Sequence, residues 1–557
     1  TGMLALFKNT IGVFNVATGV SALYSNTEGN YNTAGGIGSL YANTTGGQNT
    51  ALGAYALYNN ETGNNATAIG FNAMRYANNT TTPFDNHGVA VGFEALRGSA
   101  TPASNFGANN TALGYQSLRN NSTGSNNTAT GNEALYANTA GGFNTAHGSK
   151  ALYSNTTGNH NTGVGVEALY LNTEGTFNTA HGIRALYTNS SGDQNTAIGS
   201  HVLLYNSTGS NNTSLGALTL EYNSSGNDNT AAGMRALLNN VTGDKNTAYG
   251  GNALMYSRAG NHATAIGYEA MMSSYSTYSS FDNHNVAVGY QAMKGGDDPL
   301  YNNGNNNTAL GYQALLNNAG GSYNSATGTN ALRTNFGGEN NTANGYQSLF
   351  NNSSGNANTA IGMNSLYFNT TGINNAAFGR SAYFDLANLD NTSCFGHTSG
   401  GINDVDNRVE IGNTSVSWIG GQVGWSTYSD ARIKGNIAEN VPGLAFITRL
   451  RPVTYNLNIR YQEQLVHPVK RDESEWDTKY DIEKIRMTGF IAQEVEQAAK
   501  ESGYDFSGLE VPVSTNGLYS LRYSEFVMPL VKAVQEQQQM IETLKKEIEQ
   551  LKKRVPE

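Results

Sequence analysis

A serine and a lysine stand five residues apart in the stretch TYSDARIKGNI, residues 427–437. A serine hydroxyl becomes a nucleophile when a neighbouring base removes its proton. A lysine can act as that base once desolvation or a nearby positive charge lowers its pKa from about 10.4 toward neutrality. Ser429 and Lys434 could therefore form a nucleophile–base dyad, although the spacing alone is more typical of a surface serine and a solvated lysine. Asp430 could orient the nucleophile or cap the following turn.

The composition of the 557 residues favours several units or a repeat array over a disordered chain. Charged residues make up 13%, hydrophobic residues 38%, and there are 66 glycines. The net charge of −10 argues against a nucleic-acid partner. The chain contains no run of about 18 apolar residues, so no membrane-spanning helix is predicted. Cys394 is the only cysteine, so no disulfide can form within the chain.

Most of the chain repeats with a fixed period. The glycines that close the pattern NTAxG are separated by 17 residues in eighteen intervals and by 22 residues in four, from Gly2 to Gly396. The leucine of the ALY motif keeps the same step. A period of this length predicts a solenoid, in which each unit buries its apolar face against its neighbours. The repeat begins in mid-pattern, so we expect further residues upstream.

Each 17-residue unit is too short for a pair of helices and fits two strands of four to six residues, separated by Gly/Asn turns. Along NTAxG, the alanine and the x residue point to opposite faces. One row should line the interior and the other should be covered by partner chains, but the sequence does not assign them. The x row is mostly large and apolar, with Leu52, Ile69, Val91, Leu113, Ile198, Leu310 and Phe378.

The 22-residue units carry matching insertions, PFDNHGVAVG at residues 83–92 and SFDNHNVAVG at residues 280–289. Insertions at a constant register emerge on one face of a solenoid, which is often the binding face. The alternative is that both are tolerated loops without a ligand. The candidate receptor contacts are Phe84, Asp85, Asn86, His87, Phe281, Asp282, Asn283 and His284.

Polar residues interrupt the x row at a few coils. His147 and His181 lie two coils apart, with Val164 between them. If this row faced a threefold axis, each position would form a ring of imidazoles able to hold an anion, a water molecule or a metal ion. Otherwise the two histidines face the surface or bind nearby carbonyls. No other metal site and no cofactor is predicted. The many Asn-x-Thr triplets favour stacked Asn and Thr ladders over glycosylation.

The pattern changes after residue 396. Residues 397–428 lose the period and predict a β-rich neck. Residues 488–501 have the spacing of an amphipathic helix, with one face formed by Ile491, Val495 and Ala498. The end of the chain, about 526–555, carries heptads that predict a coiled coil, and Val or Ile at a with Leu at d favours two strands. The a positions are Val527, Val534, Ile541, Ile548 and Val555, and the d positions are Leu530, Gln537, Leu544 and Leu551.

These motifs resemble two known families. NTAIG followed by xxAL resembles the β-roll heads of trimeric autotransporter adhesins and related phage tail-fibre repeats, although their coils are shorter. VEIGNTSVSWIGG, WSTYSDARIKGNI, GLAFITRLRPVTYNLN, GFIAQEVE and LRYSEFVMPLVKAVQE occur in this order between about residues 409 and 557. They resemble the C-terminal intramolecular chaperone of endosialidase-type phage tailspikes. This resemblance implies a homotrimer that cuts off its own chaperone, with Ser429 as the nucleophile and Lys434 as the general base.

The sequence therefore predicts a mainly β protein with three parts. They are a trimeric β-roll or β-solenoid shaft of 17-residue coils at 1–396, a neck at 397–428, and an α+β chaperone domain at 429–557 that ends in a coiled coil. The predicted role is adhesion by an extracellular fibre, on a virion tail or a bacterial surface. The only enzymatic activity expected is a single cut in cis beside Ser429, because the shaft contains no HExxH, GxSxG or phosphate-loop motif.

The expected partners are further copies of the chain in a homotrimer, a cell-surface receptor or glycan, and an upstream fibre, baseplate or anchor component. No nucleic acid and no membrane insertion are expected. The main alternative is the shaft of a tailspike whose catalytic domain lies upstream. Ice binding is a remote alternative, because most coils offer one Thr rather than a Thr-x-Thr pair.

Overall fold

The computed structural model of the protein describes residues 1–77, 79–274, 279–296, 299–383, 388–400, 405–466, 478–513 and 517–554. These residues form two compact units, Thr1–Ala357 and Asn358–Glu557. The sequence change at residue 396, which we expected to end the shaft, therefore lies within the second unit rather than between the two.

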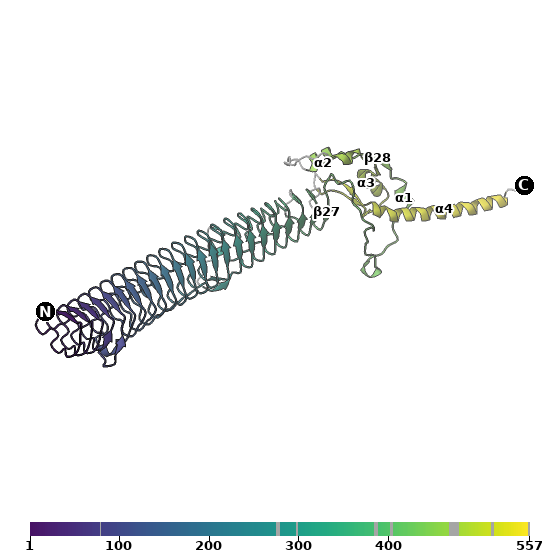
Figure 1. The fold of residues 1–557 in the computed structure, drawn as a ribbon. Helices are drawn as coiled ribbons and strands as arrows, with labels where there is room; N and C mark the ends of the chain where they lie inside the picture. Colours follow the sequence, from purple (N-terminus) through teal and green to yellow (C-terminus); the bar gives the residue numbers. More distant parts are fainter. Residues whose placement is uncertain are drawn as a thin grey trace. The chain divides into compact units, whose positions relative to one another are not determined.

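The first unit is a β-solenoid with a three-residue strand in each coil (Figure 1). Each strand pairs in parallel with the equivalent strand of the next coil, so that Ala51 lies beside Ala68 and Leu52 beside Ile69. This pairing confirms the solenoid that the period predicts. The ladder consists of β1 (Val16–Thr18), β2 (Thr33–Gly35), β3 (Thr50–Leu52), β5 (Thr67–Ile69), β7 (Val89–Val91), β8 (Thr111–Leu113), β9 (Thr128–Thr130), β10 (Thr145–His147), β11 (Thr162–Val164), β12 (Thr179–His181), β13 (Thr196–Ile198), β14 (Thr213–Leu215), β15 (Thr230–Ala232), β16 (Thr247–Tyr249), β18 (Thr264–Ile266), β20 (Val286–Val288), β21 (Thr308–Leu310), β22 (Ser325–Thr327) and β23 (Thr342–Asn344).

The expectation of two strands of four to six residues per coil is wrong. The ALY leucine has a left-handed φ, for example 50° at Leu57 and 51° at Leu135, and an extended strand cannot contain such a residue. Among the described residues, a second strand occurs only at the long coils. There β4 (Gly63–Asn64) pairs with β6 (Phe84–Asp85), and β17 (Gly260–Asn261) pairs with β19 (Phe281–Asp282). Two 3₁₀ turns, η1 (Pro102–Ser104) and η2 (Pro299–Tyr301), lie in the second 22-residue coil of each pair, one coil after β6 and β19.

The alanine row lines the interior of the coils, and the x row lies on the outer surface. Ala68 and Leu57 are fully buried, whereas Ile69 and Leu310 keep exposed fractions of 38% and 47%. The structure thus assigns the two rows that the sequence leaves open. The residue two positions after x adds a second exposed apolar row, which includes Phe71, Tyr115, Ile183, Tyr268 and Tyr312.

Buried asparagines connect successive coils. Asn172 donates from Nδ2 to Asn155 Oδ1 over 2.8 Å and to the Gly175 carbonyl over 3.0 Å, and Asn189 donates to Asn172 Oδ1 over 2.8 Å. Such ladders satisfy the amides of fully buried side chains, as the Asn-x-Thr triplets predict. The closing glycine is equally constrained. At Gly53, with φ +136°, a Cβ would lie 2.5 Å from the carbonyl oxygen of the next coil's glycine, so no larger residue fits.

The second unit begins with strands of the same coil type, and these extend past residue 396. β27 pairs in parallel with β26, and Glu410 lies beside Cys394. Among the described residues of the expected β-rich neck, β27 is the only strand, so the neck is largely irregular rather than β-rich. The coil strands of this unit are β24 (Thr359–Ile361), β25 (Ala376–Phe378), β26 (Ser393–Phe395) and β27 (Val409–Ile411).

The rest of the second unit is α+β. Its elements are η3 (Ala431–Ile433), α1 (Leu444–Ile447), β28 (Val453–Tyr455), α2 (Ile459–Val466), η4 (Asp481–Lys484), β29 (Met487–Gly489), α3 (Ala492–Glu501), β30 (Leu509–Glu510), β31 (Ser520–Leu521), η5 (Tyr523–Phe526) and α4 (Val527–Arg554). β28 pairs with β29 and β30 with β31, both antiparallel. The amphipathic helix predicted at 488–501 forms as α3 but begins at Ala492, because residues 488–489 belong to β29. Val495 and Ala498 of its predicted apolar face are buried, whereas Ile491 precedes the helix and is exposed. The core cluster comprises Phe446, Val495, Ala498, Ala499, Phe506 and Phe526.

The predicted heptad segment forms one continuous helix, α4. Its a and d side chains are exposed in the single chain, with exposed fractions of 45% at Ile541, 55% at Leu544 and 51% at Ile548. Val555, the last a position, lies outside the described residues. The heptad seam is therefore formed and remains uncovered by this chain. Within the described ranges, no helix combines the length and apolarity that a membrane crossing requires.

Candidate active site

A short turn brings Ser429 and Lys434 together. η3 (Ala431–Ile433) reverses the chain between them, and the Lys434 backbone N–H donates to the Ala431 carbonyl over 3.3 Å. The Lys434 side chain folds back so that Nζ lies 2.6 Å from Ser429 Oγ. The pair that the spacing suggested is therefore in hydrogen-bond contact, at the distance that a nucleophile and its base require.

Asp430 caps this turn. Its Oδ1 accepts a hydrogen bond from the Arg432 backbone N–H over 2.9 Å, and its Oδ2 lies 2.7 Å from Arg432 Nη2. The side-chain bond from Arg432 lowers the pKa of the Asp430 carboxyl. Of the two roles that the sequence leaves open, this geometry is that of the cap, and the carboxylate holds the turn on which Ser429 and Lys434 stand.

The dyad lies in a segment that is exposed over its whole length in the single chain. Every residue from 417 to 440 is exposed, including large apolar side chains. Trp418 is 77% exposed, Trp425 90%, Tyr428 93% and Ile437 76%. So many large, exposed apolar side chains on one segment indicate an interaction site.

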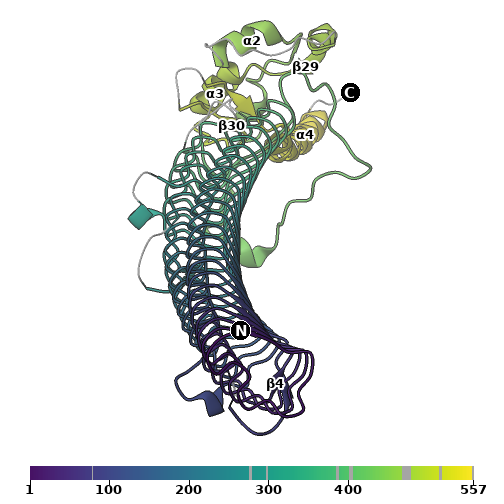
Figure 2. The ribbon, with the colours of Figure 1, turned by 60° about the vertical axis from the view of Figure 1, so that its left-hand side comes forward.

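The two insertions place only some of their residues on the surface. Asp85, His87, Asp282 and His284 are exposed, whereas Phe84 and Phe281 are half-buried. Asn86 and Asn283 are buried and are therefore not accessible to a receptor. Their side chains instead accept the backbone N–H groups of Gly88 and Asn285, each over 3.0 Å. The two insertions take equivalent places in the stack, because β6 pairs with β4 and β19 with β17, and the turns η1 and η2 in the coils that follow them project on the same side of the first unit (Figure 2).

His147 and His181 lie on the exposed x row. They end β10 and β12, and Val164 of β11 separates them. The surface alternative therefore describes their position in the single chain. Sequence reasoning missed a different histidine, His262, whose Nδ1 lies 3.1 Å from Asp282 Oδ1. A signal was available, because His262 and His284 occupy equivalent positions one 22-residue coil apart.

Comparisons with known proteins bear on the C-terminal part. A family model described as chaperone of endosialidase matches residues 429–504. The match begins at Ser429 and includes Lys434. The chain therefore carries a chaperone-of-endosialidase domain after a β-solenoid, as the second resemblance implies. No curated protein and no solved structure matched the chain.

Proposed function

We propose that this chain is one subunit of a homotrimeric adhesive fibre, whose C-terminal domain guides assembly and then cuts itself off beside Ser429. The observation that carries the proposal is the 2.6 Å contact between Lys434 Nζ and Ser429 Oγ, at the first residues of the matched chaperone domain. Direct contact between a nucleophile and a candidate base is what acyl transfer from a peptide bond requires.

The cut is a hydrolysis in two steps. Ser429 Oγ attacks the carbonyl carbon of the scissile bond while its proton passes to the deprotonated Lys434 amine. Lys434 returns that proton to the leaving amino group, and an ester to Ser429 remains. Water then hydrolyses the ester, which restores the serine hydroxyl and gives one new carboxyl group. One peptide bond and one water molecule are consumed.

Assembly would switch the cut on. A lysine acts as a general base only after it loses its proton, and removal from water favours the neutral amine. In the single chain Ser429 and Lys434 are both exposed, so their removal from water would have to come from partner chains. Partner chains that cover Trp418, Trp425 and Tyr428 would also exclude water from the dyad. Cleavage would then report that assembly is complete.

Two exposed apolar surfaces support association with further copies. One is the x row of the solenoid, and the other is the seam of α4. Completing the burial of a half-exposed Leu or Ile contributes about 1 kcal/mol, and both surfaces repeat such positions many times. The heptads alone favour two strands, so the number three rests on the resemblance to homotrimeric families.

Adhesion follows from the shape and exposure of the first unit. A solenoid whose coils bond to one another is stable without a large core, and the exposed insertion residues offer polar contacts on one side. The proposed partners are a cell-surface receptor or glycan and an upstream fibre, baseplate or anchor component. The proposed location is extracellular, on a virion tail or a bacterial surface.

Intact mass after expression tests the cleavage. We expect the wild type to yield residues 1–428 and 429–557, or 1–429 and 430–557, and this result also identifies the scissile bond. Ser429→Ala and Lys434→Arg should stay whole, because an arginine keeps the positive charge but does not lose its proton. The matched control is Ser426→Ala, on the same exposed segment, which should be cut normally. A wild type that remains full-length as a trimer would refute self-cleavage.

A further inference from the structure

Two histidines and an aspartate converge on the outer surface of the first unit. Among the residues that the structure describes, His262, Asp282 and His284 form the one group of three or more potential metal ligands. The three ligand atoms all lie within 4.8 Å of one another, and all three residues are exposed. This cluster lies apart in sequence from the Ser429–Lys434 dyad, and the proposed cleavage does not use it.

The distances show that both imidazoles face the same carboxylate. His262 Nδ1 lies 3.1 Å from Asp282 Oδ1, and His284 Nε2 lies 3.9 Å from Asp282 Oδ2. The two imidazole rings are stacked, with centroids 5.0 Å apart and an interplanar angle of 14°. An ordinary surface ion pair needs one of these histidines, whereas this arrangement directs a nitrogen from each toward the carboxylate.

The solenoid itself brings the three residues together. β17 and β19 pair in parallel, which places Asp282 beside Asn261 and hence next to His262. His262 and His284 occupy the same position of consecutive coils, and both have a left-handed φ, 60° and 47°. Their Cα atoms are thus fixed by the backbone, while their exposed side chains remain free to adjust.

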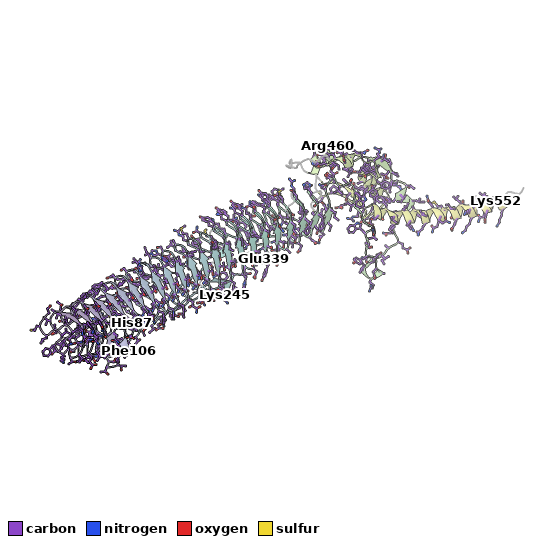
Figure 3. The ribbon with its side chains drawn as sticks, viewed as in Figure 1. His87, Phe106, Lys245, Glu339, Arg460 and Lys552 are labelled. Atoms are coloured by element: carbon purple, nitrogen blue, oxygen red, sulfur yellow. The ribbon has the colours of Figure 1, made fainter. Side chains whose placement is uncertain are left out.

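The other pair of long coils provides an internal comparison. There β4 and β6 place Asp85 beside Asn64, and His87 (Figure 3) stands where the second pair has His284. The position of His262 is taken by Asn65, whose Nδ2 donates to Asp85 Oδ1 over 3.2 Å. The first insertion therefore has the aspartate and one histidine, but an amide replaces the second imidazole.

We propose that His262, Asp282 and His284 bind a divalent transition-metal ion, with Zn²⁺ as the best fit. Two imidazoles and one carboxylate form a common Zn²⁺ ligand set, with bonds of about 2.0–2.2 Å. Tetrahedral ligands then stand roughly 3.4 Å apart, so a separation of up to 4.8 Å closes by at most about 1.4 Å through rotation of the exposed side chains. Water or a group on a bound molecule takes the fourth position.

Zn²⁺ titration of the full-length chain, followed by calorimetry, tests the site. We expect the wild type to bind one more Zn²⁺ per chain than His262→Asn, which copies the first insertion, and Asp282→Asn should behave in the same way. Asn65→His should add one Zn²⁺ per chain, because it completes the cluster at Asp85 and His87. His160→Asn, on the same row of the solenoid, is the matched control and should leave the stoichiometry unchanged.

Two outcomes would overturn the proposal. One is equal Zn²⁺ stoichiometry and affinity for the wild type and His262→Asn, with both proteins folded by circular dichroism. The other is a loss of the site in His160→Asn as large as in His262→Asn, which would mean nonspecific binding by surface histidines. Because the proposal does not depend on cleavage or trimerisation, the result is informative whichever way the Ser429 experiment ends.

Discussion

Replacing one buried asparagine of the solenoid should open the coils around it. In Asn172→Ala, the chain loses the two hydrogen bonds that Asn172 Nδ2 donates to Asn155 Oδ1 and to the Gly175 carbonyl, and the one that Asn172 Oδ1 accepts from Asn189. All three asparagines are fully buried, so water cannot replace the lost partners without entering the stack.

The expected cost follows from these bonds. Each lost hydrogen bond that leaves a buried group without its partner costs about 1–1.5 kcal/mol. Asn189 Nδ2 still donates to the Gly192 carbonyl over 2.9 Å, so it keeps one of its two hydrogen bonds. Three such losses sum to about 3–4 kcal/mol. Because coils interact only with their neighbours, the effect should stay near the substitution. Amide hydrogen exchange there should accelerate by roughly 100-fold or more.

Hydrogen exchange with mass spectrometry measures this effect coil by coil. Glu174→Ala is the matched control, because Glu174 lies two residues away and is exposed, so its loss should change exchange little. The reasoning fails if Asn172→Ala exchanges like the control. It also fails if protection falls evenly along the whole solenoid, because the ladder would then be one cooperative unit rather than a chain of neighbour contacts.

Three further predictions concern the second unit. Phe446→Ala removes a fully buried ring whose centroid lies 5.1 Å from that of the Phe506 ring. It should lower the free energy of unfolding of the C-terminal domain, measured by chemical denaturation, by about 3–5 kcal/mol. A decrease below about 1 kcal/mol would mean that Phe446 is not central to the core. Leu544→Asp places a charge in the α4 seam and should lower the mass of the assembly measured by light scattering. Gln539→Asp, outside the a and d positions, should leave that mass unchanged. Equal effects of the two substitutions would mean that the seam does not hold the chains together. Burial raises the pKa of the Cys394 thiol to about 12, so alkylation at pH 8 should be slow until the protein unfolds, and fast labelling of the native chain would contradict this burial.

The solenoid could be predicted because its signal is a period. A fixed 17-residue step forces equivalent residues to stack, whatever the coil looks like in detail. Strand alternation also predicted that the alanine and the x residue face opposite ways. Which row lies inside depends on the direction in which the chain closes each coil. Both rows are apolar, so composition does not decide this, and the structure shows Ala68 inside and Ile69 outside.

The second strand was predicted wrongly for a local reason. Leucine rarely adopts a left-handed φ, so nothing in the ALY motif itself indicates the turn that it forms. In the structure Leu57 accepts that conformation, buries its side chain completely, and still donates its N–H to the Ala73 carbonyl of the next coil over 3.0 Å. Packing against neighbouring coils therefore outweighs the backbone preference of the residue. A single coil does not contain that information, because the compensating contacts come from the coils on either side.

The candidate site shows the same division between local and nonlocal information. The Ser429–Lys434 contact is local, spanning a single 3₁₀ turn, and the spacing together with the family resemblance suggested it. The cluster of His262, Asp282 and His284 depends on adjacent coils and was missed. Asp282 and His284 had been considered only as loop residues, and His262, at the same position one coil earlier, was not aligned with them.

In the proposed assembly, the exposure of the dyad segment would link association and cleavage thermodynamically. Trp425 and Tyr428 are 90% and 93% exposed, so any partner that covers this segment gains the free energy of burying them, about 1.5–3 kcal/mol for each large apolar side chain. The same contact would remove water from Lys434, which lies six residues after Tyr428 and nine after Trp425, and would favour its neutral form. Coupling of this kind is reciprocal. A substitution that keeps residue 434 charged, such as Lys434→Arg, should therefore weaken association of the C-terminal domains as well as block the cut. A neutral Lys434→Met should block the cut and leave association intact. If the two variants assembled equally well, burial of this segment would not extend to residue 434, and assembly would have to activate the dyad by another route.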